Sequence, residues 1–227
     1  SKGASNKMVV EQLISPIVPT LIPTDTGDKA LTLMDENNLA QLPLIADEKY
    51  VGLVQENDLL DWETPDKSLQ NADFLGYRPA VLASGHPYEA LRIAHQQNLA
   101  VVPVVDAENT YVGSITRDEL LRYVTENTGL NNPGGIIVLE IDPRNYSLYE
   151  IARICESEEV LLISTQIFSN KLTGKLEVTL KTNRNSLGGV VSALERHNYK
   201  VKEVFGDTTD QDSLQDRFDN LMNYLNM

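Results

Sequence analysis

The chain has 227 residues, of which 41% are hydrophobic and 23% charged, a composition that suits packed cores and argues against wholesale disorder. Its net charge of −14 disfavours binding to a nucleic-acid backbone, and a single cysteine, Cys155, excludes an intrachain disulfide framework. The longest apolar stretch, residues 99–105, is too short to cross a bilayer, and residues 1–7 lack an apolar signal core. We therefore expect a cytoplasmic protein with no membrane or nucleic-acid partner.

An internal repeat organises the first half of the chain. A shift of 60 residues aligns residues 28–47 with residues 88–107, and six of the twenty columns are identical. After one inserted residue the match resumes, with five identities in eleven columns that include Tyr50 with Tyr111 and Gly52 with Gly113. We call residues 1–63 repeat 1 and residues 64–126 repeat 2.

Each repeat predicts a helix, two short strands and a second helix. The expected ranges are 30–39, 42–45, 50–54 and 56–62 in repeat 1, and 90–97, 101–105, 111–115 and 117–124 in repeat 2. A unit of this size buries too little apolar surface to be stable alone. Two repeats that meet face to face would solve that problem and leave a ligand cleft between them.

The repeats resemble a known family. Each has an apolar strand, Leu42-Pro-Leu-Ile or Val102-Pro-Val-Val, followed by a motif that begins with glycine, at residues 52–59 and 113–120. Residues 8–126 therefore resemble a tandem pair of CBS domains, also called a Bateman module. The resemblance implies an adenosine-containing ligand, such as AMP, ADP, ATP or S-adenosylmethionine, with a motif threonine on phosphate and a motif aspartate on the ribose hydroxyls.

Both motif copies depart from the family pattern. Repeat 1 keeps Asp58 but has Gln55 in place of threonine, whereas repeat 2 keeps Thr116 but has Glu119 in place of aspartate. Arg117 follows Thr116, and Arg78 lies in the segment that leads into the first helix and strands of repeat 2. Because a guanidinium is a natural phosphate contact, we expect a nucleotide to prefer repeat 2. The alternative is that Arg117 is a solvated residue and the cleft is empty. The candidate ligand-binding residues are Thr116, Arg117, Glu119, Arg78, Asp58, Gln55 and Thr20.

The second half has a different pattern of elements. Strands are expected at residues 136–141, 160–168, 175–182 and 201–205, with a helix after the capping box Ser147-Leu-Tyr-Glu150 and another capped by Ser186. This βαββαβ order predicts a ferredoxin-like domain, with an antiparallel sheet and both helices on one of its faces.

Residues 135–206 resemble an ACT domain, a regulatory module of amino-acid metabolism. The family implies an amino-acid ligand at a glycine in the first strand–helix loop, but residues 143–147 contain none. Dimerisation is therefore the favoured role of this domain. The domain order resembles that of acetoin-utilisation accessory proteins. The acidic tail, residues 207–227, predicts an amphipathic helix from Ser213 that carries Leu214, Phe218, Leu221, Met222 and Leu225 on one face.

The whole chain is thus expected to be an α+β protein in which residues 127–134 link a tandem CBS-domain pair to an ACT-like domain. We expect no catalytic residue and no metal site, because His86, His95 and His197 are scattered and lack ligand spacing. The favoured function is a regulatory sensor of a small effector, acting as a homodimer and through a further protein partner not identified by the sequence. The alternative is an oligomerisation scaffold whose ligand sites have degenerated.

Overall fold

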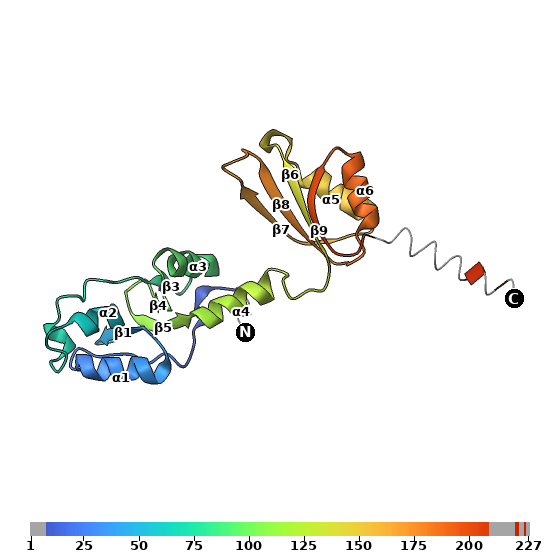
Figure 1. Cartoon of the computed structure of the whole chain (residues 1–227). Helices are drawn as coiled ribbons and strands as arrows, with labels where there is room; N and C mark the ends of the chain where they lie inside the picture. The colour runs from blue at the N-terminus through green and yellow to red at the C-terminus, as the bar shows by residue number, and fades with distance from the viewer. Residues whose placement is uncertain (1–7, 209–220, 223–224, 226–227) are drawn as a thin grey trace. The chain divides into compact units, whose positions relative to one another are not determined.

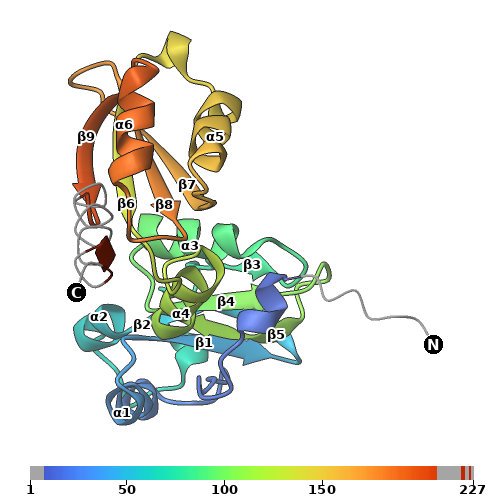
Figure 2. The same ribbon diagram turned by 90° about the vertical axis from the view of Figure 1, so that its right-hand side faces the viewer.

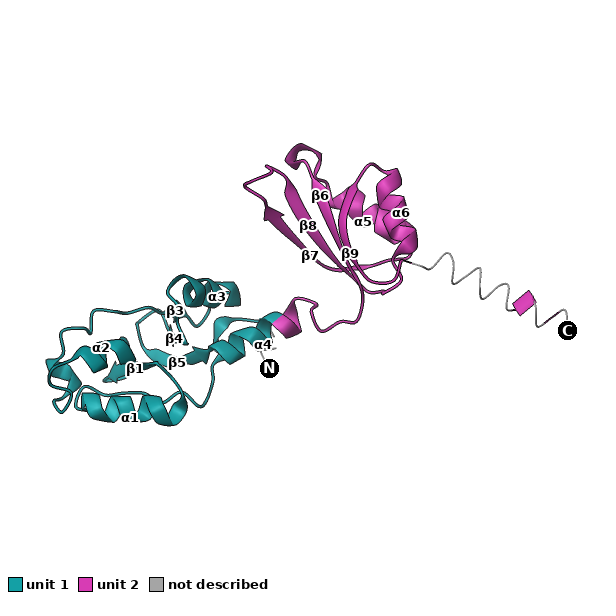
Figure 3. Ribbon diagram, viewed as in Figure 1, with its two compact units in different colours: residues 1–124 teal, residues 125–227 magenta. Residues whose placement is uncertain are grey.

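The computed structural model describes residues 8–208, 221–222 and 225, and it divides into two compact units. Unit 1 comprises Ser1–Val124 and unit 2 comprises Thr125–Met227 (Figures 1 and 3). The division falls inside helix α4, which runs from Arg117 to Asn127. The helix expected in the tail lies mainly outside the described residues, so it stays a prediction.

Repeat 1 contains the predicted helix, two strands and helix. These are α1 (Gly27–Asn37), β1 (Gln41–Ala46), β2 (Lys49–Gln55) and α2 (Glu56–Asp61), with a 3-10 turn at Leu69–Asn71 after them. The hydroxyl of Thr26 caps α1 by accepting a hydrogen bond from Lys29 N at 3.1 Å. Asn38, in the left-handed conformation at φ 52°, then ends the helix.

Repeat 2 has the same order with one additional strand. Its elements are β3 (Val81–Leu82), α3 (Pro87–Gln96), β4 (Val101–Val105), β5 (Tyr111–Thr116) and α4. The short β3 pairs parallel to β4, and β5 pairs antiparallel to β4 on the other side. A 3-10 turn at Val10–Leu13 precedes α1 in the chain, yet its buried residues pack in the core of repeat 2. The start of the chain therefore helps to close the second repeat.

The turns between paired strands join the two repeats by a reciprocal exchange. Tyr50 N donates to the carbonyl of Asn109 at 3.1 Å, and Tyr111 N donates to the carbonyl of Glu48 at 2.9 Å. Both acceptor residues have positive φ, 63° at Asn109 and 66° at Glu48. Since the tyrosines are equivalent in the repeat, as are the two acceptors, unit 1 has an internal two-fold relation.

The turn of repeat 2 is one residue longer, and an aspartate closes it. Asp106 Oδ1 accepts hydrogen bonds from Glu108 N at 2.9 Å and from Thr110 N at 2.8 Å. These bonds hold the pKa of Asp106 below its usual range. The equivalent position of repeat 1 is Ala46, whose side chain cannot accept such bonds, and the turn there is one residue shorter.

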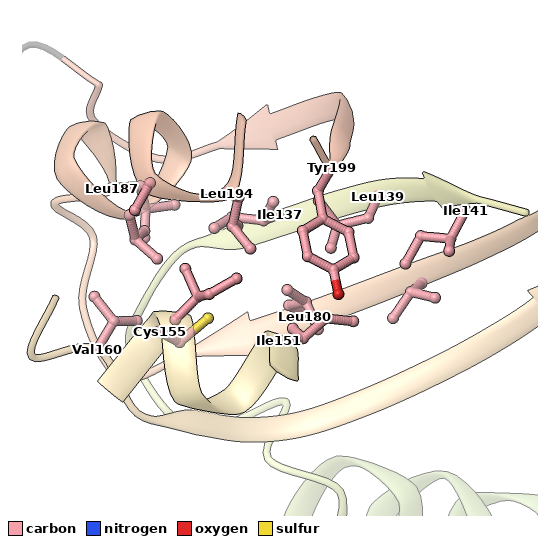
Figure 4. Close-up of a cluster of buried hydrophobic side chains, with 14 residues drawn as sticks. Ile137, Leu139, Ile141, Ile151, Cys155, Val160, Leu180, Leu187, Leu194 and Tyr199 are labelled. Atoms are coloured by element: carbon pink, nitrogen blue, oxygen red, sulfur yellow. The ribbon is translucent and has the colours of Figure 1, made fainter. Parts of the chain in front are cut away.

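Unit 2 has the βαββαβ order expected from the sequence. Its elements are β6 (Ile136–Ile141), a 3-10 turn (Pro143–Asn145), α5 (Leu148–Ser157), β7 (Leu162–Ser169), β8 (Leu176–Thr182), α6 (Gly188–Arg196) and β9 (Lys200–Phe205). The sheet has the order β7-β8-β6-β9, and every neighbouring pair is antiparallel. Both helices lie on one face, where Ile137, Leu139, Leu180 and Leu194 meet in the core (Figure 4).

Of the two capping predictions for unit 2, the one at Ser147 is confirmed and the one at Ser186 is wrong. Ser147 Oγ accepts from Glu150 N at 3.2 Å and caps α5 as predicted. The cap of α6 is Leu187 rather than Ser186. Leu187 is fully buried and its N–H donates to the carbonyl of Asp207 at 2.7 Å, so core packing and this bond set the start of α6.

Cys155 is buried in the core of unit 2, as expected for a small hydrophobic residue, and burial raises its pKa to about 11. No helix among the described residues is long and apolar enough to span a membrane.

Candidate functional site

The two motif copies lie at equivalent places, where the second strand of each repeat passes into its second helix. Gln55 is the last residue of β2, and Asp58 lies in the first turn of α2. Thr116 is the last residue of β5, and its hydroxyl accepts from Glu119 N at 3.4 Å in the first turn of α4. The duplicated backbone therefore presents two potential ligand sites, and the side chains decide how they differ.

In repeat 1, the Gln55 amide belongs to a contact between the repeats. Gln41 Nε2 donates to Gln55 Oε1 at 3.4 Å, while Gln41 Oε1 accepts from Ala100 N at 2.8 Å and from Val101 N at 3.4 Å. Gln41 is only 6% exposed. The position where the family places a phosphate-binding threonine thus carries an amide that is already held by its neighbour.

Asp58 lines an acidic pocket of about 480 Å³. Three other carboxylates share the lining, and Trp62 and Phe74 form a T-shaped aromatic pair with ring centroids 5.5 Å apart. The acidic side chains are Asp58, Asp61, Glu63 and Asp73. No lysine, arginine or histidine is found among the described residues of this lining, so its potential opposes an anionic phosphate.

In repeat 2, Arg117 points to the turn between α3 and β4 and not to Thr116. Its Nε donates to the carbonyl of Leu99 at 2.8 Å, and its Nη2 donates to Asn98 Oδ1 at 2.7 Å. Glu119 forms an ion pair with Arg122 one turn along α4. Both side chains therefore have partners within their own repeat.

Arg78 is exposed and lies before β3, at the same end of the sheet as Thr116. This follows from strand register, because Val81 pairs with Val104 in the parallel β3–β4 ladder and Val101, at the start of β4, pairs with Thr116. Within the described residues, no hydrogen bond or ion pair joins Arg78 to Thr116 directly. Thr20 is exposed and next to Leu21, which bridges to Leu44 of β1 as Val81 pairs with Val104, so Thr20 corresponds to Ala80 and the residue of repeat 1 that corresponds to Arg78 is Val18.

A cluster of three tyrosines centres on Tyr50, which contacts the segment that carries Arg78. The Tyr50 hydroxyl donates to the carbonyl of Pro79 at 2.8 Å, Tyr77 donates to Gln97 Oε1 at 2.9 Å, and the Tyr111 hydroxyl shares a 2.7 Å hydrogen bond with Ser114 Oγ. Burial raises the pKa of Tyr50, with smaller contributions from Tyr77 and Tyr111, and the charge of Arg78 acts in the opposite direction. Sequence reasoning did not identify this cluster, although the repeated Tyr50 and Tyr111 were a signal for it.

Unit 2 has a polar pocket of about 450 Å³ at the end of β6. Two of its acids are already paired, Glu140 with Lys200 at 3.0 Å and Asp142 with Arg144 at 3.3 Å, and these cations lower the pKa of each acid, that of Asp142 to about 2. Asp142 Oδ1 also accepts from Arg144 N and caps the 3-10 turn. In the part of the chain that the structure describes, no group of three His, Cys, Asp or Glu side chains is placed to hold a metal ion.

Comparison with known proteins identifies the repeat. The family model of the CBS domain matches residues 10–64 and 79–126. An inosine-5'-monophosphate dehydrogenase of Thermoplasma acidophilum is 32% identical over 131 residues, which are 56% of this chain and 26% of the relative. An uncharacterised protein of Methanocaldococcus jannaschii is 26% identical over 219 residues, 84% of this chain and 48% of the relative. The chain thus spans half or less of the length of these relatives.

Two solved structures resemble about half of the chain. CBSX2 of Arabidopsis thaliana in complex with AMP is 25% identical with a TM-score of 0.46, over 53% of this chain and 98% of that one. A CBS domain pair/ACT domain protein of Thermotoga maritima is 21% identical with a TM-score of 0.47, over 52% and 98%. The family match covers both repeats and agrees with their internal duplication, so unit 1 contains a tandem pair of CBS domains.

Proposed function

We propose that unit 1 is a non-catalytic regulatory module that senses an adenosine-containing nucleotide at the motif of repeat 2. The observation that carries this proposal is the contrast in charge between the two motifs. Arg78 is exposed at the same end of the sheet as Thr116, whereas the repeat 1 motif opens on four carboxylates. An arginine and a hydroxyl suit a phosphate, and tyrosine rings beside Arg78 suit an adenine.

Isothermal titration calorimetry with AMP, ADP, ATP and S-adenosylmethionine tests this function. We expect Arg78→Gln and Thr116→Ala each to weaken nucleotide binding by about tenfold, the loss of roughly one charge-assisted hydrogen bond. Asp58→Ala is the matched control in repeat 1, and it should leave the affinity within about twofold. Absence of binding heat with all four compounds would contradict the sensor function.

A second function, an oligomerisation scaffold, is favoured by two specific contacts. The Gln55 amide is bonded to Gln41, and the Arg117 guanidinium is bonded to Leu99 and Asn98. Both candidate residues therefore have a structural role that requires no ligand. A thermal-shift measurement separates the two functions, because a nucleotide that binds the folded state must raise the melting temperature, by an amount that grows with the logarithm of its concentration over the Kd, and a scaffold would show no shift.

We propose further that residues 135–206 form an ACT-like, ferredoxin-like domain that assembles the protein into a homodimer. The antiparallel order β7-β8-β6-β9 with two helices on one face supports this assignment. The loop after β6 is capped by Asp142 and contains no glycine, which favours assembly over amino-acid binding. In this scheme residues 1–63 and 64–126 are the two CBS repeats, 127–134 is the linker and 207–227 is the tail.

A further inference from the structure

The sheet of unit 2 has one face on which no described helix of the unit lies. Helices α5 and α6 share the opposite face (Figures 2 and 4). Because side chains alternate along a strand, the register gives the residues of the free face, which we call the open face. They are Ser164, Gln166 and Phe168 on β7, Glu177, Thr179 and Lys181 on β8, Ile136, Val138 and Glu140 on β6, and Lys200, Glu203 and Phe205 on β9.

Apolar side chains cross the open face from one corner to the other. Phe205 pairs with Ile136 where β9 ends, Val138 lies at the centre, and Phe168 lies near the end of β7 at the opposite end of the sheet. Val138 is 9% exposed, but the two phenylalanines are 58% and 61% exposed. We call this row of four residues the apolar diagonal. Two largely exposed aromatic rings on one sheet face indicate a surface that another element covers.

The charged residues beside the apolar diagonal are already paired. Lys202 forms an ion pair with Glu177, and Lys200 with Glu140 at 3.0 Å. Lys181 Nζ donates to the carbonyl of Gly134 at 3.0 Å. An element placed on the open face would therefore bury no isolated charge, which removes the main cost of covering a polar surface.

The end of the chain leaves unit 2 beside the same corner. Asp207 N donates to the carbonyl of Asn185 at 2.7 Å, and the carbonyl of Asp207 accepts from Leu187 N at 2.7 Å. These bonds fix the exit of the chain two residues after Phe205, at one end of the apolar diagonal. Residues 209–227, most of which lie outside the described part, continue from this point.

The sequence of residues 213–225 suits the open face in pattern and in length. Its apolar stripe consists of Leu214, Phe218, Leu221, Met222 and Leu225, and the three members that the structure describes are exposed. A helix of this size is marginal in water unless its apolar face is packed. It would be about 20 Å long, and the apolar diagonal, which crosses all four strands, also measures about 20 Å.

We propose that residues 213–225 form a helix that docks its apolar stripe along the apolar diagonal of its own unit 2, as a third layer. Residues 208–212 tether this helix beside the open face, so its effective concentration there exceeds that of a free second copy. Asp216 lies opposite the stripe by helical spacing and stays in water. The docking requires neither a bound nucleotide nor the homodimer.

Thiol labelling of the open face tests the docking in otherwise intact protein. Thr179 pairs with Val138 in the register, so Thr179→Cys places a thiol at the centre of the apolar diagonal. We expect a water-soluble maleimide to label it about tenfold faster when the chain is truncated after Thr208. Leu172→Cys, at the exposed tip of the β7–β8 hairpin, is the control whose rate should not change. Cys155 can stay, because it is buried and burial raises its pKa to about 11.

Two serine variants of the full-length chain give a second readout that does not depend on truncation. In the Thr179→Cys background, we expect Phe218→Ser to raise the labelling rate toward that of the truncated chain, because it removes the largest side chain of the stripe. Asp216→Ser is the matched control on the opposite side of the same helix, and it should leave the rate within about twofold of the parent.

Three results would overturn the docking. The first is an equal labelling rate at position 179 with and without residues 209–227, and the second is an equal effect of the two serine variants. The third is protection that disappears on dilution, which would place the segment on a second copy. Protection that persists at all concentrations and is lost with Phe218→Ser alone would support docking within one chain. Failure of nucleotide binding in calorimetry would affect none of these results.

Discussion

In both repeats an asparagine with positive φ connects the first helix to the first strand: φ is 52° at Asn38 of repeat 1 and 53° at Asn98 of repeat 2. They also share the exchange of backbone hydrogen bonds between their turns. The positions at which they differ include Gln55 against Thr116, Glu56 against Arg117, and Ala46 against Asp106. The comparison teaches that backbone geometry has been retained after duplication while the chemistry of the two surfaces has diverged.

The first and largest prediction concerns equivalent leucines that differ in burial. Leu99 is fully buried, whereas Leu39 is only partly buried. We expect Leu99→Ala to lower the free energy of unfolding of unit 1 by about 3 kcal/mol, and Leu39→Ala by about 1 kcal/mol, because the cavity left at a site open to solvent is smaller. Urea denaturation measures both. Equal losses would show that the repeats are packed alike despite the difference in exposure.

A second prediction concerns the hydrogen bonds that a side chain of repeat 1, Gln41, makes to the backbone of repeat 2. Gln41 accepts two backbone N–H groups at the start of β4, and its equivalent, Val101, has no acceptor to return the contact. We expect Gln41→Val to lower the free energy of unfolding by about 1–2 kcal/mol, because buried donors are left without a partner. Gln70→Val, at an exposed glutamine of the same unit, is the control. A neutral result at Gln41 would mean that water replaces the amide.

A third prediction uses pH to examine the longer turn of repeat 2. The pKa of Asp106 is lowered in the folded state, first by the Thr110 N–H, so its contribution to stability is present above the unfolded pKa and is lost as pH falls through the folded pKa. We expect Asp106→Ala to lower the melting temperature at pH 7 and to lose this effect at acid pH. Thermal melts from pH 7 to pH 2 measure the difference. A constant difference would indicate that the carboxylate charge is not involved.

The fourth prediction has the smallest expected effect: the fluorescence of Trp62 should not change when a nucleotide binds. Trp62 is the one tryptophan of the chain and lines the acidic pocket of repeat 1. A nucleotide bound at repeat 2 should therefore give calorimetric heat while Trp62 emission stays constant. Saturable quenching of Trp62 with the calorimetric affinity would place the ligand at repeat 1, contrary to our proposal. Lysozyme is a suitable control for absorption of the exciting light by the nucleotide.

The fold was predictable where a local pattern repeats. The helices and paired strands of unit 1 follow from the apolar spacing that both copies share, and the cap at Ser147 follows from a capping box. The two-residue strand β3 carries no periodicity, so it was missed. The start of α6 was misplaced because it depends on Leu187, whose burial is a tertiary property.

The candidate site was less accessible to sequence reasoning. The positions of the motif residues follow from the repeat, but the direction of Arg117 depends on the Leu99 carbonyl, which a distant turn places beside it. Likewise, Gln41 has the sequence signature of a surface residue and becomes an internal link only when the repeats meet. The roles of the seven candidate residues in ligand binding stay predictions.

The reciprocal bonds between Tyr50, Asn109, Tyr111 and Glu48 have a consequence for how the gene can be divided. Without its partner, each repeat would have a tyrosine N–H and a turn carbonyl that lack their hydrogen-bond partners. Two identical subunits complete each other in the same way across a symmetry axis, so the tandem behaves as a covalently fused dimer. A break introduced in the connection between α2 and β3 should accordingly yield two fragments that complement each other when co-expressed, and neither should accumulate alone.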